Sequence, residues 1–159
     1  PLPRPPQAAL LAAQRGLCPG CREKLPMAFV NRPRYCHYLG LYFCTQCHNG
    51  EPKVIPWRVA ERWDFEPRKV CRAAAEYLEA QAGQPLIPIS SVRRTRVTSQ
   101  QALTELHGLR RRLTRLRQLA ADVECCFLQE LLRMSLPTLQ PHWAEGHELY
   151  SLRDLARLE

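Results

Sequence analysis

Leucines recur at helical spacing between residues 98 and 119 and line one face of a predicted helix. They step by 3, 3, 4, 3 and 3 residues, in the order Leu103, Leu106, Leu109, Leu113, Leu116 and Leu119. The helix is predicted to begin near Thr98-Ser99, and further apolar positions extend it toward Pro137, before which it must end. An apolar stripe of this kind predicts that one face of the helix packs against protein.

Shorter patterns precede that helix. The aromatic-rich run 35–43 predicts a hairpin of two strands that turns near Gly40. Apolar residues from Trp57 to Ala82 recur at helical spacing, so two helices joined at Glu66-Pro67 are expected. The run 85–89 predicts a short extended linker, because the residue before each proline is pushed out of the helical region. The fold class is therefore mostly α with a small β-rich part near the N-terminus.

Near the C-terminal end of the sequence, a further helix is predicted to begin. Ser151 and Asp154 have the spacing of an N-cap with an acid in the first turn. Leu155 and Leu158 then begin an apolar face that stops after two turns. We therefore expect the native protein to continue beyond Glu159, and the Pro-rich start, which lacks a methionine, indicates an excised or late-starting chain.

Composition changes this picture little. The 159 residues are 45% hydrophobic and 24% charged, which is typical of a globular protein with a packed core. No apolar run approaches the roughly 18 residues that cross a bilayer, and the first residues do not form a secretory signal. An intracellular, reducing setting is expected.

The positive charge is concentrated in one stretch. Between Arg93 and Arg117 lie eight arginines and one acid, a net +7 of the +8 that the whole chain carries. On the predicted helix the arginines cover the faces that leucine leaves free, and we interpret them as a solvated basic face. Those on its central turns are Arg110, Arg111, Arg112, Arg115 and Arg117.

Cysteines carry the strongest chemical signal. Two Cys-x-x-Cys pairs, Cys18/Cys21 and Cys44/Cys47, are separated by 22 residues, close to the spacing of structural zinc sites. Four thiolates would close the tetrahedron without an open position, so the site would support folding and not catalysis. Two disulfides or a redox dithiol are the alternatives. A redox dithiol normally comes as a single pair in a βαβ pattern, so zinc is favoured.

Other cysteines and one histidine are ambiguous. Cys36 and His48 are candidate ligands of a second ion, although His48 directly follows Cys47 and a neighbour so close rarely reaches the same ion. We interpret Cys71 and the Cys125-Cys126 pair as small buried hydrophobes.

Several segments together resemble the Rubicon-homology domain family. They are the run 34–48, Ile55-Pro56-Trp57-Arg58-Val59, Trp63-Asp64-Phe65 and the run 147–155, so the likeness covers about residues 16–158. The resemblance implies a zinc-bearing helical domain, contact with a late-endosomal Rab GTPase, and regulation of autophagosome and endosome–lysosome traffic. It also implies a cytoplasmic protein that is peripheral on late endosomes, lysosomes and autophagosomes.

The resemblance also suggests how the chain is divided. Residues 1–15 would be a Pro-rich lead, 16–56 a zinc-binding knuckle, and 57–159 the helical part of the domain. Family members continue into a second Cys/His-rich half that is not found here, so the domain is expected to be incomplete at its C-terminus.

The hairpin region is also similar to a treble-clef FYVE finger. In that comparison Cys36 would begin a second metal site, and Leu39 stands where the next cysteine would be. Arg32, Arg34 and His37 would occupy the place of the basic run that holds a phosphoinositide, and they supply a weak phosphate or membrane site.

The sequence is compatible with two function classes and argues against a third. A non-catalytic zinc adaptor with a Rab as its protein partner is the main hypothesis, and a basic nucleic-acid-binding zinc protein is the alternative that the charge permits. The basic stretch lacks interleaved aromatics for base stacking. An enzyme such as a RING-type ligase needs eight cross-braced ligands, more than the chain offers. His107, His142 and His147 lie in no recognisable catalytic motif and are interpreted as surface or core histidines.

Overall fold

The computed structural model describes residues 5–25, 31–92, 97–123, 125–135, 142–143 and 146–158. By their internal contacts these residues form two compact units. Unit 1 comprises residues 1–55 and 65–82, and unit 2 comprises residues 56–64 and 83–159. Each unit is therefore assembled from two stretches of chain, and residues 65–82 pack with the N-terminal cysteines.

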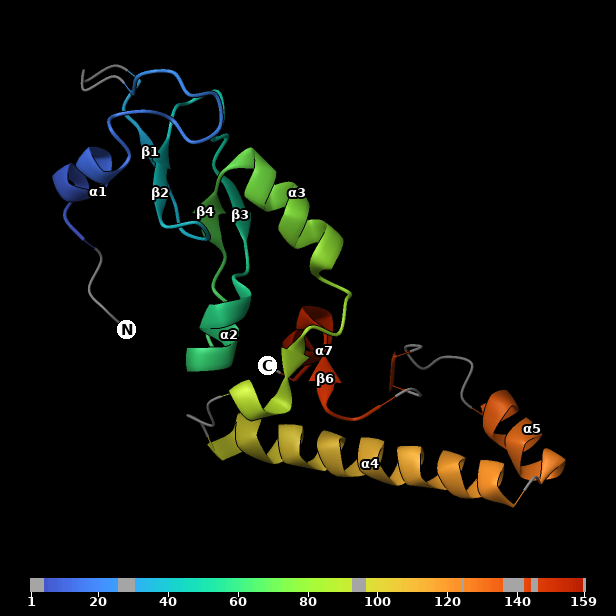
Figure 1. Cartoon of the computed structure of the whole chain (residues 1–159). Coiled ribbons are helices and arrows are strands. Elements are labelled where there is room, and N and C mark those ends of the chain that lie inside the picture. The colour runs from blue at the N-terminus through green and yellow to red at the C-terminus, as the bar shows by residue number, and fades with distance from the viewer. Residues whose placement is uncertain are drawn as a thin grey trace. The chain divides into compact units, whose positions relative to one another are not determined.

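Unit 1 is built on two small antiparallel strand pairs (Figure 1). β1 (Arg34–Cys36) pairs with β2 (Leu41–Phe43), and the chain turns between them at Gly40, whose φ of 70° favours glycine. This is the hairpin that the aromatic run predicts. β3 (Glu51–Lys53) pairs with β4 (Arg68–Val70), a pair that the sequence pattern did not reveal. The prediction of helix at Val70 was wrong, because β4 stands between the two expected helices and α3 begins only at Arg72.

Two helices complete unit 1. α1 (Gln7–Ala13) contacts β2, and α3 (Arg72–Gln81) contacts β3. Gln14 ties the end of α1 to the hairpin, because its side chain donates to the carbonyl oxygen of Tyr42 at 2.9 Å and accepts from the amide of the same residue at 2.9 Å. The core of the unit draws on α1, β1, β2, β4 and α3. Its buried members are Leu11, Cys18, Leu25, Cys36, Tyr42, Phe43, Cys44, Val70, Cys71, Ala74, Ala75 and Leu78.

Unit 2 contains the long helix. Its described elements are α2 (Pro56–Arg62), β5 (Ile87–Pro88), the 3-10 turn η1 (Ile89–Ser91), α4 (Val97–Asp122), α5 (Cys126–Ser135), β6 (Leu149–Tyr150) and α7 (Leu152–Ala156). β5 pairs with β6, so part of the predicted apolar linker is a strand. α7 begins with the predicted cap, a full capping box between Ser151 and Asp154.

The leucine pattern continues over two helices and not one. α4 ends at Asp122 and α5 begins at Cys126, and the side chain of Gln129 on α5 donates to the carbonyl oxygen of Ala120 on α4. The stripe is also only partly covered. Leu103 is buried, whereas Leu116 is 55% exposed, so the expectation of a packed face holds only near the start of α4.

Candidate metal centre

Four cysteines from two turns meet at one point in unit 1. The ligand atoms of Cys18, Cys21, Cys44 and Cys47 all lie within 4.8 Å of one another, and the Sγ atoms of Cys21 and Cys44 are 3.7 Å apart. This is the arrangement that the spacing predicts. Four clustered thiols are the donor set that zinc uses in structural sites, so the group could hold a metal ion and is compatible with zinc.

Backbone hydrogen bonds shape both turns. In the first, the amide of Arg22 donates to the carbonyl oxygen of Cys18 at 2.8 Å, and the amide of Cys18 donates to the carbonyl oxygen of Glu23 at 2.8 Å. In the second, the amide of His48 donates to the carbonyl oxygen of Cys44 at 3.1 Å. The amide of Cys44 also donates to Sγ of Cys18 at 3.4 Å, which links the two turns.

Gly20 allows the two turns to approach each other. A Cβ atom at this position would lie 2.8 Å from Sγ of Cys47 and 3.1 Å from its Cβ. Since real Cβ atoms essentially never approach other atoms so closely, any side chain here would push the two cysteine pairs apart. Glycine is therefore a requirement of the cluster.

The thiols strongly influence one another. Burial raises the pKa of Cys18, but hydrogen bonds from the backbone of Cys44, Cys21 and Gly20 outweigh it and lower that pKa to about 7. Burial and the neighbouring sulfurs raise the pKa of Cys47 to about 12. Four sulfurs so close can therefore not all ionise by themselves, and a bound divalent cation is what would make four thiolates compatible.

Cys36 and His48 lie outside this cluster. Sγ of Cys36 accepts the amides of Leu39 at 3.5 Å and Cys71 at 3.3 Å, so the two buried cysteines contact each other away from the four-cysteine group. Nε2 of His48 donates to the carbonyl oxygen of Tyr35 at 3.1 Å. Within the described residues, neither side chain belongs to a group of three or more metal ligands.

A basic cavity opens beside the hairpin. It has a volume of about 520 Å³ and is lined by Arg34, His37 and Lys69 together with Tyr35, His48, Asn49 and Gly50. Arg34 also donates from Nη1 to the carbonyl oxygen of His48 at 2.8 Å. Two of the three predicted phosphate-binding residues thus line one cavity, whereas Arg32 is exposed on the segment before β1.

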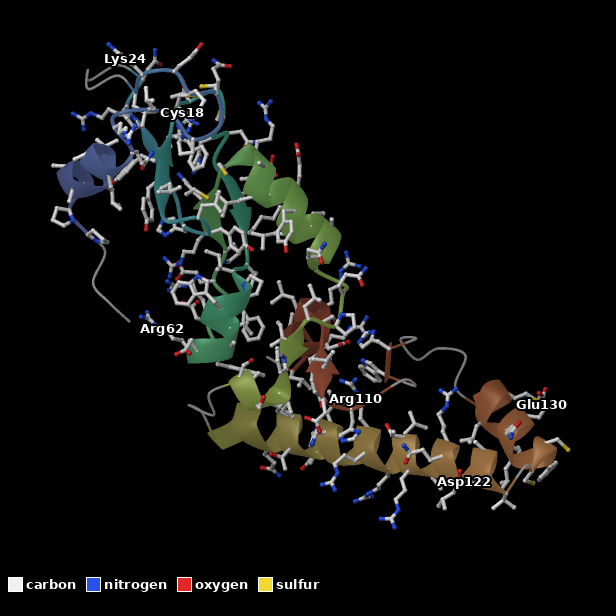
Figure 2. All side chains as sticks on the ribbon, viewed as in Figure 1. Cys18, Lys24, Arg62, Arg110, Asp122 and Glu130 are labelled. Carbon is white, nitrogen blue, oxygen red and sulfur yellow. The ribbon has the colours of Figure 1, made fainter. Side chains whose placement is uncertain are left out.

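The basic residues of α4 fall into two groups. Arg111, Arg112, Arg115 and Arg117 are exposed. Arg110 is only 2% exposed, and its guanidinium carbon lies 4.2 Å from the ring centroid of Tyr150 in β6 (Figure 2). Its Nη2 donates to the carbonyl oxygen of Gly146 at 2.8 Å. Arg110 is therefore a packing residue, and the predicted solvated face begins at Arg111. Arg93, Arg94 and Arg96 lie outside the described residues.

Sequence reasoning missed the partners of three histidines, because all of them are distant along the chain. Nε2 of His142 donates to the buried carboxylate of Asp154 at 2.7 Å. His107 and His147, which are 40 residues apart, have ring centroids separated by 5.4 Å. No local motif could have revealed these pairs, since the first depends on how α7 packs against residues 142–143 and the second on how α4 packs against His147.

The part of the chain that the structure describes includes no helix long and apolar enough to cross a lipid bilayer.

Comparison with known proteins gives consistent matches. The family model described as Rubicon Homology Domain matches residues 34–159. The chain is 29% identical to the human "Protein associated with UVRAG as autophagy enhancer" over 150 residues. The aligned residues make up 94% of this chain and 22% of that protein. It is 29% identical to the mouse "Run domain Beclin-1-interacting and cysteine-rich domain-containing protein" over 153 residues, which is 96% of this chain and 16% of that protein.

A fly protein, "Differentially expressed in FDCP 8 homolog" from Drosophila melanogaster, is 31% identical over 150 residues, 94% of this chain and 30% of that protein. The chain thus spans less than a third of the length of these relatives. Because the family model covers well over half of the 159 residues, the chain belongs to the Rubicon homology domain family.

Proposed function

We propose that this chain is a non-catalytic, zinc-containing adaptor domain of autophagy and endolysosomal traffic that contacts a late-endosomal Rab GTPase. Family membership supports the adaptor role, because two of the three relatives carry names that refer to autophagy or to Beclin-1 interaction, and none of the three is named as an enzyme. The domain would work as a peripheral protein on late endosomes, lysosomes and autophagosomes.

The main support for a protein-binding role is an exposed apolar surface on α4 and α5. Large apolar side chains there are 43–69% exposed, although their spacing would suit a protein core. We call this the α4–α5 surface, and its members are Leu109, Leu116, Leu119, Val123, Phe127, Leu128, Leu131 and Met134. Contiguous exposed apolar residues mark protein-interaction sites. Exposed arginines on α4 would give such contact a polar, basic rim.

The four-cysteine cluster supports the structural role of zinc in this proposal. Cys18 and Cys44 belong to the core of unit 1 and Cys47 packs against it, so an ion held by the four cysteines would link the first loop and the hairpin to the core that α3 completes. A site closed by four protein ligands keeps no coordination position for a substrate. Zinc would thus stabilise the adaptor and take no part in a reaction.

We expect substitution of the α4–α5 surface to abolish Rab binding. In Leu116→Asp/Phe127→Asp, two exposed apolar contacts become charges that would have to be desolvated at the interface. Affinity for a GTP-loaded late-endosomal Rab should fall by at least about 30-fold, as for loss of an interface hot spot. Biolayer interferometry with the GTP-loaded and GDP-loaded forms measures the change.

Leu86→Asp is the matched control, because Leu86 is a similarly exposed leucine of the same unit that lies outside the α4–α5 surface. It should leave Rab affinity unchanged. If the double variant binds the Rab with wild-type affinity, the proposed surface is excluded. Strong binding of random duplex DNA that collapses with salt, with no Rab binding by the wild type, would favour the nucleic-acid alternative.

The basic cavity supports a second candidate, recognition of the anionic headgroup of a phosphoinositide. Arg34, His37 and Lys69 surround a cavity large enough for a phosphorylated ring. Such a site would help hold the adaptor on an anionic membrane while the Rab supplies the second contact.

Lys69→Glu tests this candidate, because it reverses one charge of the cavity at an exposed position. We expect co-sedimentation with vesicles that contain phosphatidylinositol 3-phosphate to fall by about fivefold, as for one charge-assisted contact near a membrane surface. Lys24→Glu reverses an exposed charge elsewhere in unit 1 and should bind like the wild type. Equal losses in both variants would indicate nonspecific charge attraction and contradict a dedicated site.

A further inference from the structure

A second group of metal-ligating side chains lies in unit 2. His107 on α4, and His147 with Glu148 just before β6, present ligand atoms that all lie within 4.8 Å of one another. Apart from the four-cysteine cluster, this is the one group of three or more such residues among those that the structure describes. It brings together donors from two segments that are 40 residues apart in sequence.

Hydrogen bonds hold these donors in place without an ion. Nδ1 of His107 donates to the carbonyl oxygen of His147 at 3.2 Å, and the hydroxyl of Tyr150 lies 3.5 Å from the same nitrogen. Nε2 of His147 lies 3.0 Å from Oε1 of Glu148. A metal ion would take the place of a proton between such groups, because both imidazole and carboxylate bind metals in their deprotonated forms.

The surroundings leave room for further ligands. His147 and Glu148 also line a cavity of about 360 Å³, together with Thr114 and Leu149. An ion held by the three side chains would therefore keep an open position for water or for a donor from a partner. Two imidazoles and one carboxylate form a donor set that zinc accepts in three-ligand sites. A four-thiolate site, in contrast, has no such open position.

One nearby charge opposes cation binding. The guanidinium of Arg110 packs on Tyr150, the residue whose hydroxyl reaches His107, and Arg110 lines the same cavity. Its positive charge and the exposure of Glu148 weaken the attraction for a divalent ion. The site should therefore bind zinc much more weakly than the four cysteines do, and exchange it readily.

We propose that His107, His147 and Glu148 form a second, exchangeable zinc site that fastens α4 to the segment before β6. The site uses none of the residues of the four-cysteine cluster or of the α4–α5 surface. When zinc binds, it would restrain the start of β6 against α4 and so stiffen the part of unit 2 that carries the α4–α5 surface.

Titration of the full chain with ZnCl2 tests the proposal. Starting from protein with one equivalent bound, calorimetry should show one further equivalent with a dissociation constant at least about 100-fold weaker than the first. In parallel, Co²⁺ should give sulfur-to-metal charge-transfer absorption for the first equivalent only. The proposal is overturned if the wild type binds no second equivalent of metal. It is also overturned if the second equivalent of Co²⁺ shows sulfur-to-metal charge-transfer absorption.

Three variants assign the site. His107→Gln and Glu148→Gln should each weaken the second equivalent by at least about 100-fold, since even outer-shell changes weaken metal sites by 10–100-fold. Both should keep the first equivalent. Glu148 is exposed, so its variant keeps the test decisive if His107→Gln fails to fold. His37→Gln alters a histidine of unit 1 and should retain both equivalents. Retention of the second equivalent in Glu148→Gln would contradict the assignment.

Discussion

We expect Cys18→Ser to bind no zinc and, as a result, to lose the folded state of unit 1. Cys18 is fully buried, and its sulfur accepts the amide of Cys44, so this atom is both a proposed ligand and the link between the two cysteine turns. Apparent binding free energies of structural zinc are about 10–16 kcal/mol, which exceeds the stability of a small unit. Without one thiolate, unit 1 would depend on its small apolar core alone, and we expect the two cysteine turns to separate.

Elemental analysis of dialysed protein should give one zinc per wild-type chain and none per Cys18→Ser chain. Hydrogen exchange should show that amides of the segment 17–50 lose protection in the variant, and the wild type should show the same loss after chelation. The amides of α4 in unit 2 should stay protected in both cases, because α4 belongs to the other unit.

Cys36→Ser is the matched control, since Cys36 is equally buried in unit 1 and lies outside the cluster. It should unfold more easily but keep one zinc. Cys126→Ser changes an exposed cysteine and should behave like the wild type. If wild-type protein holds no zinc, or folds unchanged after chelation, the metal centre is excluded; loss of zinc from Cys36→Ser would make Cys36 a ligand.

Asp154→Asn should destabilise unit 2 by about 2–4 kcal/mol. The carboxylate is 2% exposed and accepts three hydrogen bonds, from Nε2 of His142 at 2.7 Å, from Nε1 of Trp143 at 3.0 Å and from the amide of Ser151 at 2.9 Å. Asparagine keeps the shape but loses the charge and one acceptor, so buried donors are left unpaired. All three tryptophans belong to unit 2, and their fluorescence during urea unfolding reports on this change.

The pH dependence of this effect has a definite sign. Burial raises the pKa of Asp154, but hydrogen bonds from Ser151 and His142 outweigh it, so its pKa in the folded chain is lowered. The carboxylate therefore contributes its full stability above about pH 4, the ordinary range for aspartate, and loses it as pH falls through the folded pKa. The stability difference between wild type and Asp154→Asn should shrink in acid.

Asp122→Asn provides the control, because Asp122 is exposed at the end of α4. It should change the free energy of unfolding by less than about 0.5 kcal/mol at any pH. A difference between wild type and Asp154→Asn that stays constant or grows below pH 4 would show that Asp154 does not act as a buried carboxylate.

Local signals in the sequence predicted much of the fold. The hairpin turn at Gly40, the two Cys-x-x-Cys turns and the cap of α7 each depend on residues within a few positions of one another. β3 and β4 were missed because their short runs hold proline and several charges and show no alternation. Their pairing places Pro52 opposite Lys69, a contact that only the folded chain defines.

Long-range packing accounts for the remaining differences. Periodicity shows which leucines share a face of α4, but it cannot show what covers that face, so Leu103 is buried while Leu116 is exposed. In the same way, Arg110 resembles its neighbours in sequence, yet β6 packs over it. A contact such as that between His107 and His147 can be predicted only when the tertiary fold of the chain is known.

The split course of unit 1 has a consequence for synthesis on the ribosome. All four clustered cysteines emerge before residue 56, but Val70, Ala74 and Leu78, which complete their core, follow only after residues 56–64, which belong to unit 2. Domains generally fold as units while the chain is being made. The two cysteine turns therefore leave the exit tunnel before the residues that complete their core, and unit 1 is whole only once residue 82 has followed.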